Sequence, residues 1–113
     1  MRTEYEWTIE HIDEHTDIVD VEFYDDIDDA IAAYNLGPMP DCVRIDIGLR
    51  WMIWDDVRGL EHDGHAYADA DFNLPNVFTD NIDGIVHDVP KRFLAEWNKK
   101  RNQLKTDLTL QES

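Results

Sequence analysis

Four polar residues in one short segment supply the ligand types that transition metals prefer. Glu61, His62, Asp63 and His65 combine two imidazoles with two carboxylates, and both groups bind Zn²⁺. In an extended chain, however, His62 and His65 point to opposite faces because they lie three residues apart. The sequence offers no Cys pair and no further His at a known family spacing. We therefore predict exposed turn histidines here and no metal site.

A second segment partly matches a calcium-binding loop. Asp69, Asp71 and Asn73 occupy the first three ligand positions of that pattern. Leu74 stands where the pattern requires glycine, and Asp80 stands where it requires glutamate. The mismatch at two essential positions predicts that this segment binds no calcium.

The sequence gives little indication of covalent or acid–base catalysis. Cys42 begins a predicted strand, and Ser113 is the only serine. His11 and His15 lie near the loop of a predicted hairpin and are expected to face solvent. The five glycines are scattered singly, so no phosphate-binding loop is present. We predict no enzyme activity, no catalytic residue and no cofactor.

The charge distribution constrains the class of partner. The chain has 113 residues and a formal net charge of −16. Residues 1–88 hold 23 acidic and 4 basic side chains, whereas residues 89–113 hold 3 and 6. The excess of negative charge in residues 1–88 repels phosphate groups, which argues against direct binding to nucleic acid or to an anionic membrane. The sequence predicts a basic protein as the partner.

Three explanations of the acidity remain open. Aspartate outnumbers glutamate 18 to 8 with only four lysines, as expected for solubility or adaptation to high salt. Clustered carboxylates could instead converge on a cation. Alternatively, the surface could imitate a nucleic-acid backbone and occupy a basic groove on another protein, where complementary charge speeds association. We favour the third explanation.

Periodic patterns predict the elements that carry these charges. Apolar residues alternate with acidic ones over residues 5–9 and again over residues 19–23, which predicts an antiparallel hairpin. A short amphipathic helix is predicted over residues 27–34, with Asp25 or Asp26 at its N-cap and Gly37 just beyond its end. Unbroken alternation over residues 42–54 predicts the longest strand.

The second half of the chain is predicted in less detail. Residues 55–59 form a turn, and residues 64–72 form a strand that pairs back. Residues 73–88 are interpreted as an irregular connection that could include a short strand at residues 84–87. Asp88 is expected to cap a final helix with Pro90 in its first turn. The apolar stripe of that helix comprises Phe93, Leu94, Trp97 and Leu104.

These elements predict an α+β fold in the order β-β-α-β-β-α. An antiparallel sheet of four to five strands carries two helices packed on one face. Residues 1–104 form a single domain, and residues 105–113 form a frayed C-terminal tail. Twelve aromatic residues can fill the core without disulfides, and the single Cys42 and the N-terminal sequence predict a cytoplasmic protein.

The hairpin and the first helix carry the predicted partner-binding surface. Alternate residues on a strand lie about 6.6–6.8 Å apart, so acidic residues on both hairpin strands would form two regular rows. The helix start extends these rows, and an aromatic residue on the uncovered face of the long strand could anchor a partner or a homodimer. The predicted binding residues are Glu4, Glu6, Glu10, Asp20, Glu22, Asp25, Asp26, Asp28, Asp29 and Trp54.

Three segments carry a resemblance to a group of viral proteins. The segment from Tyr5 to Asp20, the residues 43–49 and the residues 89–93 resemble small uncharacterised acidic proteins of tailed bacteriophages. The resemblance implies an inhibitor that binds a host protein, and it implies no catalytic residues. Our expectation is a non-enzymatic acidic protein that blocks a basic, nucleic-acid-binding surface of a host protein. The alternative is a structural or assembly protein, or a homodimer, whose acidity serves solubility or tolerance of high salt.

Overall fold

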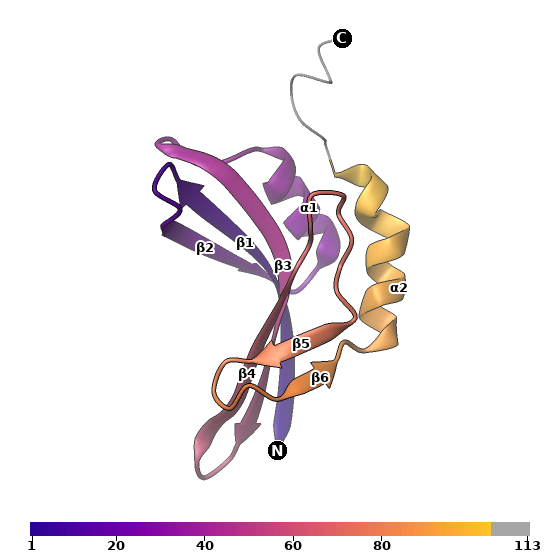
Figure 1. Ribbon diagram of the computed structural model, residues 1–113. Coiled ribbons are helices and arrows are strands. Elements are labelled where there is room, and N and C mark those ends of the chain that lie inside the picture. Colours follow the sequence, from indigo (N-terminus) through magenta and orange to yellow (C-terminus); the bar gives the residue numbers. More distant parts are fainter. Residues whose placement is uncertain (105–113) are drawn as a thin grey trace.

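The computed structural model describes residues 1–104, and the predicted frayed tail at residues 105–113 lies outside the described residues. The chain folds into one antiparallel sheet and two α-helices, the second of which ends in a short 3₁₀ turn (Figure 1). The elements are β1 (Arg2–Asp13), β2 (Ile18–Tyr24), α1 (Ile27–Asn35), β3 (Cys42–Asp55), β4 (Gly59–Tyr67), β5 (Val77–Asp80), β6 (Val86–Asp88), α2 (Lys91–Lys100) and η1 (Arg101–Gln103).

The sheet has six strands in the order β2-β1-β3-β4-β5-β6, and all neighbours are antiparallel. The predicted α+β class is confirmed, whereas the predicted count of four to five strands is wrong. The difference lies in residues 77–88, where β5 and β6 form a hairpin instead of an irregular connection. The predicted strand at residues 64–72 begins earlier, at Gly59, and ends at Tyr67.

Both helices pack on one face of the sheet, as predicted (Figure 1). Register pairs place alternate residues of β1 and β3 on that face, so Trp7 pairs with Leu49 and Ile9 pairs with Ile47. Trp97 of α2 stacks on Trp7, with 5.7 Å between the ring centroids. This face holds the hydrophobic core of the described residues: Trp7, Ile9, Ile27, Ala30, Ile31, Ile47, Leu49, Trp51, Ala66, Phe78, Val89, Trp97 and Leu104.

The apolar residues Val21 and Phe23 of β2 face away from the helices, whereas Tyr24 packs against the core. Thr8 pairs with Phe23 and Glu10 pairs with Val21, so Phe23 lies on the outer face and is 48% exposed. The register follows from the turn, in which the Asp13 carboxylate accepts hydrogen bonds from the backbone N–H groups of His15 and Asp17. Because side chains alternate along a strand, this register turns the acidic residues of β2 toward the helices.

The helix ends agree with the sequence in one case and differ in the other. Asp26 caps α1, since its carboxylate accepts a hydrogen bond from the Asp28 N–H at 2.8 Å. At α2 the N-cap is Pro90, without a side-chain hydrogen bond, and the predicted cap Asp88 ends β6 instead. Leu104 lies beyond α2 and η1, although it still enters the core. Over residues 1–104 neither helix has the length or apolar character needed to span a bilayer.

Candidate functional site

An acidic surface surrounds the gap between edge strand β2 and helix α1. Asp20 and Glu22 of β2 line a hollow of about 420 Å³ whose other wall includes Ala33, Leu36 and the segment 37–39. Four further carboxylates lie where the chain passes from β2 into α1, and they do not line the hollow. We define the β2–α1 acidic surface as Asp20, Glu22, Asp25, Asp26, Asp28 and Asp29.

Few cations neutralise this surface. Within residues 1–104, the ion pair that reaches it joins Lys100 Nζ to Asp28 Oδ1 at 2.9 Å. The remaining carboxylates are exposed. Like charges at this density repel one another, so a cationic partner would relieve the repulsion.

His11 organises the floor of the hollow, which corrects the prediction that it faces solvent. The side chain is buried, and its Nδ1 accepts a hydrogen bond from the Met39 N–H at 3.1 Å. The ring proton therefore resides on Nε2 and is donated to Glu22. The same carboxylate accepts a hydrogen bond from the Tyr24 hydroxyl at 2.6 Å. His15 is exposed, as predicted.

These hydrogen bonds shift two neighbouring pKa values in opposite directions. The bonds from His11 and Tyr24 hold the pKa of Glu22 below its ordinary value, despite some burial. The bond to Glu22, together with burial and negative charge nearby, raises the pKa of Tyr24 to about 12. Glu22 is therefore fixed as an ionised acceptor in the wall of the hollow.

The three predicted glutamates of β1 do not join this surface, because the register places them on the opposite face of the sheet. Glu6 pairs with Arg50 and Glu10 pairs with Asp46, whereas Asp20 and Glu22 lie on the helix-bearing face. Glu4 forms an ion pair with Arg2 at 2.9 Å. The predicted two-row array of carboxylates across the hairpin is thus wrong, since its two strands contribute acids to opposite faces.

Glu10 is a buried carboxylate and is therefore unavailable to a partner. It is 7% exposed and accepts a hydrogen bond from the Tyr67 hydroxyl at 3.2 Å. Burial raises the pKa of Glu10, with a further contribution from Asp46, and these effects outweigh the hydrogen bond from Tyr67 and the charge of Arg44. Burial and the Glu10 carboxylate in turn raise the pKa of Tyr67 to about 12.

Trp54, the predicted anchor, lies partly covered at the end of β3. The Arg2 guanidinium lies over its ring at 5.8 Å from the centroid. The indole Nε1 is buried and has no hydrogen-bond partner among the residues that the structure describes. Met52 on the same strand is also buried, whereas Tyr67 of β4 is partly exposed. An open aromatic patch at Trp54 is therefore not what the structure presents.

Cys42 lies among carboxylates. Burial raises the pKa of the Cys42 thiol, and the negative charges of Asp13, Asp41 and Asp20 raise it further. Nucleophilic thiolate is disfavoured in such surroundings.

The calcium-like segment forms a turn whose carboxylate is already engaged. Asp69 Oδ1 accepts hydrogen bonds from the backbone N–H groups of Asp71 and Asn73, each at 2.9 Å. These bonds lower the pKa of Asp69 against the opposing effect of desolvation. The turn uses Asp69 to fix loop geometry between β4 and β5.

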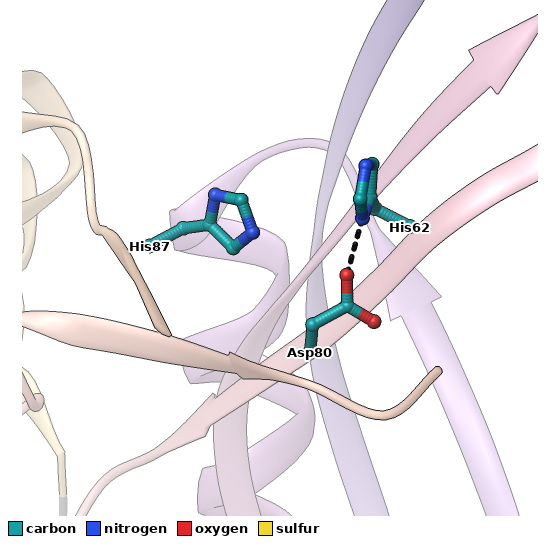
Figure 2. A group of neighbouring side chains, drawn as sticks. All are labelled: His62, Asp80 and His87. Carbon is teal, nitrogen blue, oxygen red and sulfur yellow. Dashed lines mark hydrogen bonds and ion pairs between the residues drawn. The ribbon is translucent and has the colours of Figure 1, made fainter. Parts of the chain in front are cut away.

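A second cluster joins two histidines and an aspartate at the far end of the helix-bearing face. His62 of β4, Asp80 of β5 and His87 of β6 offer one ligand atom each, and these atoms lie within 4.8 Å of one another (Figure 2). His62 Nδ1 forms a hydrogen bond with Asp80 Oδ2. The prediction of exposed turn histidines is wrong for His62, which lies in a strand, and His65 points to the opposite face and stacks on Tyr67.

Sequence reasoning missed this cluster because its members are far apart in the chain. The predicted strand at residues 64–72 began too late to include His62, and β5, which carries Asp80, was not predicted. A signal did exist. Val77, Phe78 and Thr79 have strong strand propensity, and they are followed by a polar turn that includes Gly84. A hairpin at residues 77–88 would have brought Asp80 near His87.

Comparison with known proteins finds no matching family model, no matching curated protein and no matching solved structure.

Proposed function

We propose that the chain is a non-enzymatic acidic binding protein that occupies a basic, nucleic-acid-binding surface of another protein. The observation that supports this proposal best is the β2–α1 acidic surface, in which two carboxylates of β2 line a hollow and four more lie at the start of α1. The resemblance to acidic phage proteins adds a host protein as the target and the host cytoplasm as the compartment.

The arrangement suits a cationic partner for two physical reasons. Carboxylates spread over β2 and α1 attract Lys and Arg side chains over a distance set by ionic strength, about 8 Å at physiological salt. The hollow also supplies a concave contact, so that an inserted basic side chain can lie between Glu22 and the helix wall. Complementary charge of this kind speeds association more than it adds affinity.

Some residues of the β2–α1 acidic surface also have structural roles, so they are unsuitable for testing the proposal. Glu22 and Asp26 already serve His11 and the α1 N-cap, so their substitution would disturb the fold. Asp20, Asp25 and Asp29 are exposed, which makes them the appropriate residues to neutralise.

The test is capture of partners from host lysate with nuclease present, comparing two variants of equal charge. The first replaces Asp20, Asp25 and Asp29 with Asn. The matched control replaces Asp56, Asp71 and Asp88, three exposed aspartates in other parts of the fold. We expect the native chain and the control to retain a nucleic-acid-binding protein that elutes as salt rises, and we expect the first variant to lose it.

Equal capture by the two variants would refute the role of the β2–α1 acidic surface, since total charge alone would then explain binding. Recovery of the protein itself, insensitive to salt, would refute the proposal as a whole. Far-ultraviolet circular dichroism of both variants checks that the fold is intact.

One observation favours self-association as a second candidate function. Ile18, Val19 and Phe23 on edge strand β2 are each about half exposed, and an unpaired edge strand can pair with another copy. In that case the acidity would serve solubility in a homodimer or an assembly protein. Sedimentation at low and high salt separates the two: a discrete oligomer at both concentrations favours self-association.

A further inference from the structure

We propose that His62, Asp80 and His87 form a binding site for one Zn²⁺ ion. Figure 2 shows the three side chains converging from different strands, with one ring nitrogen of His87 directed toward the pair formed by His62 and Asp80. The proposed site lies apart from the β2–α1 acidic surface and does not depend on the proposed function.

The strands position the three ligands on one face of the sheet. Gly64 pairs with Asp80, and His62 lies two residues before Gly64. The side chains of His62 and Asp80 therefore lie on the same face of the sheet. His87 pairs with Phe78, which lies two residues before Asp80. Each ligand is therefore held by backbone pairing to a neighbouring strand, which limits the freedom that metal binding would have to remove.

Two buried polar groups meet at this site, a carboxylate with partners and a ring nitrogen without one among the described residues. The Asp80 side chain is completely buried, and its Oδ1 accepts a hydrogen bond from the Ile82 N–H at 2.7 Å while Oδ2 faces His62. The Nε2 atom of His87 is buried and has no hydrogen-bond partner within residues 1–104. A buried nitrogen without a partner destabilises the fold, whereas coordination of a metal ion would satisfy it.

The spacing suits a small cation. Zinc lies about 2.0–2.1 Å from its imidazole and carboxylate ligands, which places tetrahedral ligand atoms roughly 3.4 Å apart. Ligand atoms within 4.8 Å reach that spacing by small side-chain rotations. Trp51 packs edge-on against His87 with centroids 4.8 Å apart and also contacts His62, so the indole restricts both rings.

The donor set selects the class of metal. Two imidazoles disfavour Ca²⁺ and Mg²⁺, which prefer oxygen ligands, and the absence of a thiolate among these ligands disfavours Cu⁺. Asp83 Oδ2 lies 3.8 Å from His62 Nδ1 and is partly exposed, so it can serve as the fourth ligand. Four protein ligands are typical of structural zinc sites, and here they would join β4 to the β5–β6 hairpin.

The test is titration of the chelator-treated protein with zinc by calorimetry, in excess Mg²⁺ so that surface carboxylates are already occupied. Three variants accompany the native chain. H62Q and H87Q each remove one ligand, while the matched control H65Q replaces a histidine of the same strand that stacks on Tyr67 on the other face. We expect one site per chain, weakened at least tenfold in H62Q and H87Q and unchanged in H65Q.

Cobalt provides an independent readout, because Co²⁺ in a tetrahedral site absorbs visible light strongly. The native chain and H65Q should show that absorption, and H87Q should not. Absence of one-site zinc binding in the native chain, or equal affinity in H87Q, would overturn the proposal. If H62Q fails to fold, H87Q and the cobalt spectrum decide the question, since Gln at position 87 keeps the polar character of a partly exposed strand residue.

Discussion

Glu10 is a carboxylate that the fold holds against its preference for water. Its pKa is raised in the folded state, mainly by burial, from an ordinary value of 4.5. The folded protein therefore binds the Glu10 proton more tightly than the unfolded chain, so stability is greatest below pH 4.5 and declines as pH rises through the raised value. At neutral pH the buried charge is a net cost.

We predict that Glu10→Gln is more stable than the native chain at pH 7 and that this advantage disappears near pH 4. The amide oxygen of Gln can still accept the hydrogen bond from Tyr67, while the charge is removed. Chemical denaturation at both pH values measures the difference. A variant that is less stable at pH 7 would show that the charge, rather than the hydrogen bond, stabilises this position.

The pKa of Asp55 is shifted in the opposite direction to that of Glu10. Its carboxylate accepts hydrogen bonds from the N–H groups of Arg58 and Val57, which hold the pKa of Asp55 below its ordinary value of 3.8. The ionised Asp55 carboxylate stabilises the fold fully above pH 3.8, and this contribution is lost as pH falls through the lowered pKa of the folded state. We expect Asp55→Asn to be less stable than the native chain at pH 7, with a smaller difference at pH 3 in the same denaturation series.

Residue types alone could not predict which ionisable groups are buried. Glu10 and His11 are adjacent in β1 and point to opposite faces, yet both side chains are buried. The contacts that bury them come from distant segments, with Tyr67 bonded to Glu10 and the Met39 N–H bonded to His11. The three members of the proposed zinc site are separated by 18 and 7 residues along the chain. Their convergence depends on strand pairing that a single sequence does not specify.

At the scale of elements, the contact between β3 and β4 depends on a residue without a side chain. A Cβ at Gly48 would lie 2.7 Å from the Ala66 carbonyl oxygen and 3.0 Å from Tyr67 Cδ1. Tyr67 therefore crosses the sheet directly over Gly48 to reach Glu10 on β1.

We predict that Gly48→Ala destabilises the protein by about 1–3 kcal/mol, the usual cost of forcing extra atoms into a packed region. The added methyl group meets backbone, which cannot rotate away. Urea denaturation measures the loss, with Ala70→Ser in the exposed loop after β4 as the control. An unchanged midpoint would mean that β3 and β4 separate at little cost.

The alternation of apolar and polar residues predicted where the first strands lie, but it did not predict which face of β2 is turned toward the helices. The boundaries of β2, α1 and β3 follow their patterns closely, whereas β1 extends well beyond the predicted residues 5–9 at both ends. The face of β2 is set by the turn at Asp13–Asp17 and by the register shift after His11, and an offset of one residue reverses every side chain. For this reason the predicted binding residues divide between two faces.

At the scale of the whole molecule, self-repulsion is a dominant electrostatic term. The formal net charge is −16, and the exposed ion pairs that offset it contribute little individually. Salt shortens the range of repulsion, from about 10 Å at 0.1 M to about 3 Å at 1 M.

We predict that the thermal midpoint rises with added NaCl and levels off before 1 M, as expected for screening. A linear rise without a plateau would instead indicate a general salt effect on burial, and a fall would show that ion pairs outweigh repulsion. Scanning calorimetry over a salt series distinguishes these outcomes. A variant with Asp20, Asp25 and Asp29 changed to Asn should show a smaller rise.

The stacking of Trp7 on Trp97 has a consequence for how the chain reaches its native state. These rings join the first strand of the sheet to α2, about ninety residues later, with centroids 5.7 Å apart. During synthesis, Trp7 therefore lacks this partner until nearly all of the described chain has left the ribosome, although α1 can cover other parts of the β1 face earlier. This contact completes the core last, and the high negative charge would keep incomplete chains from associating before then.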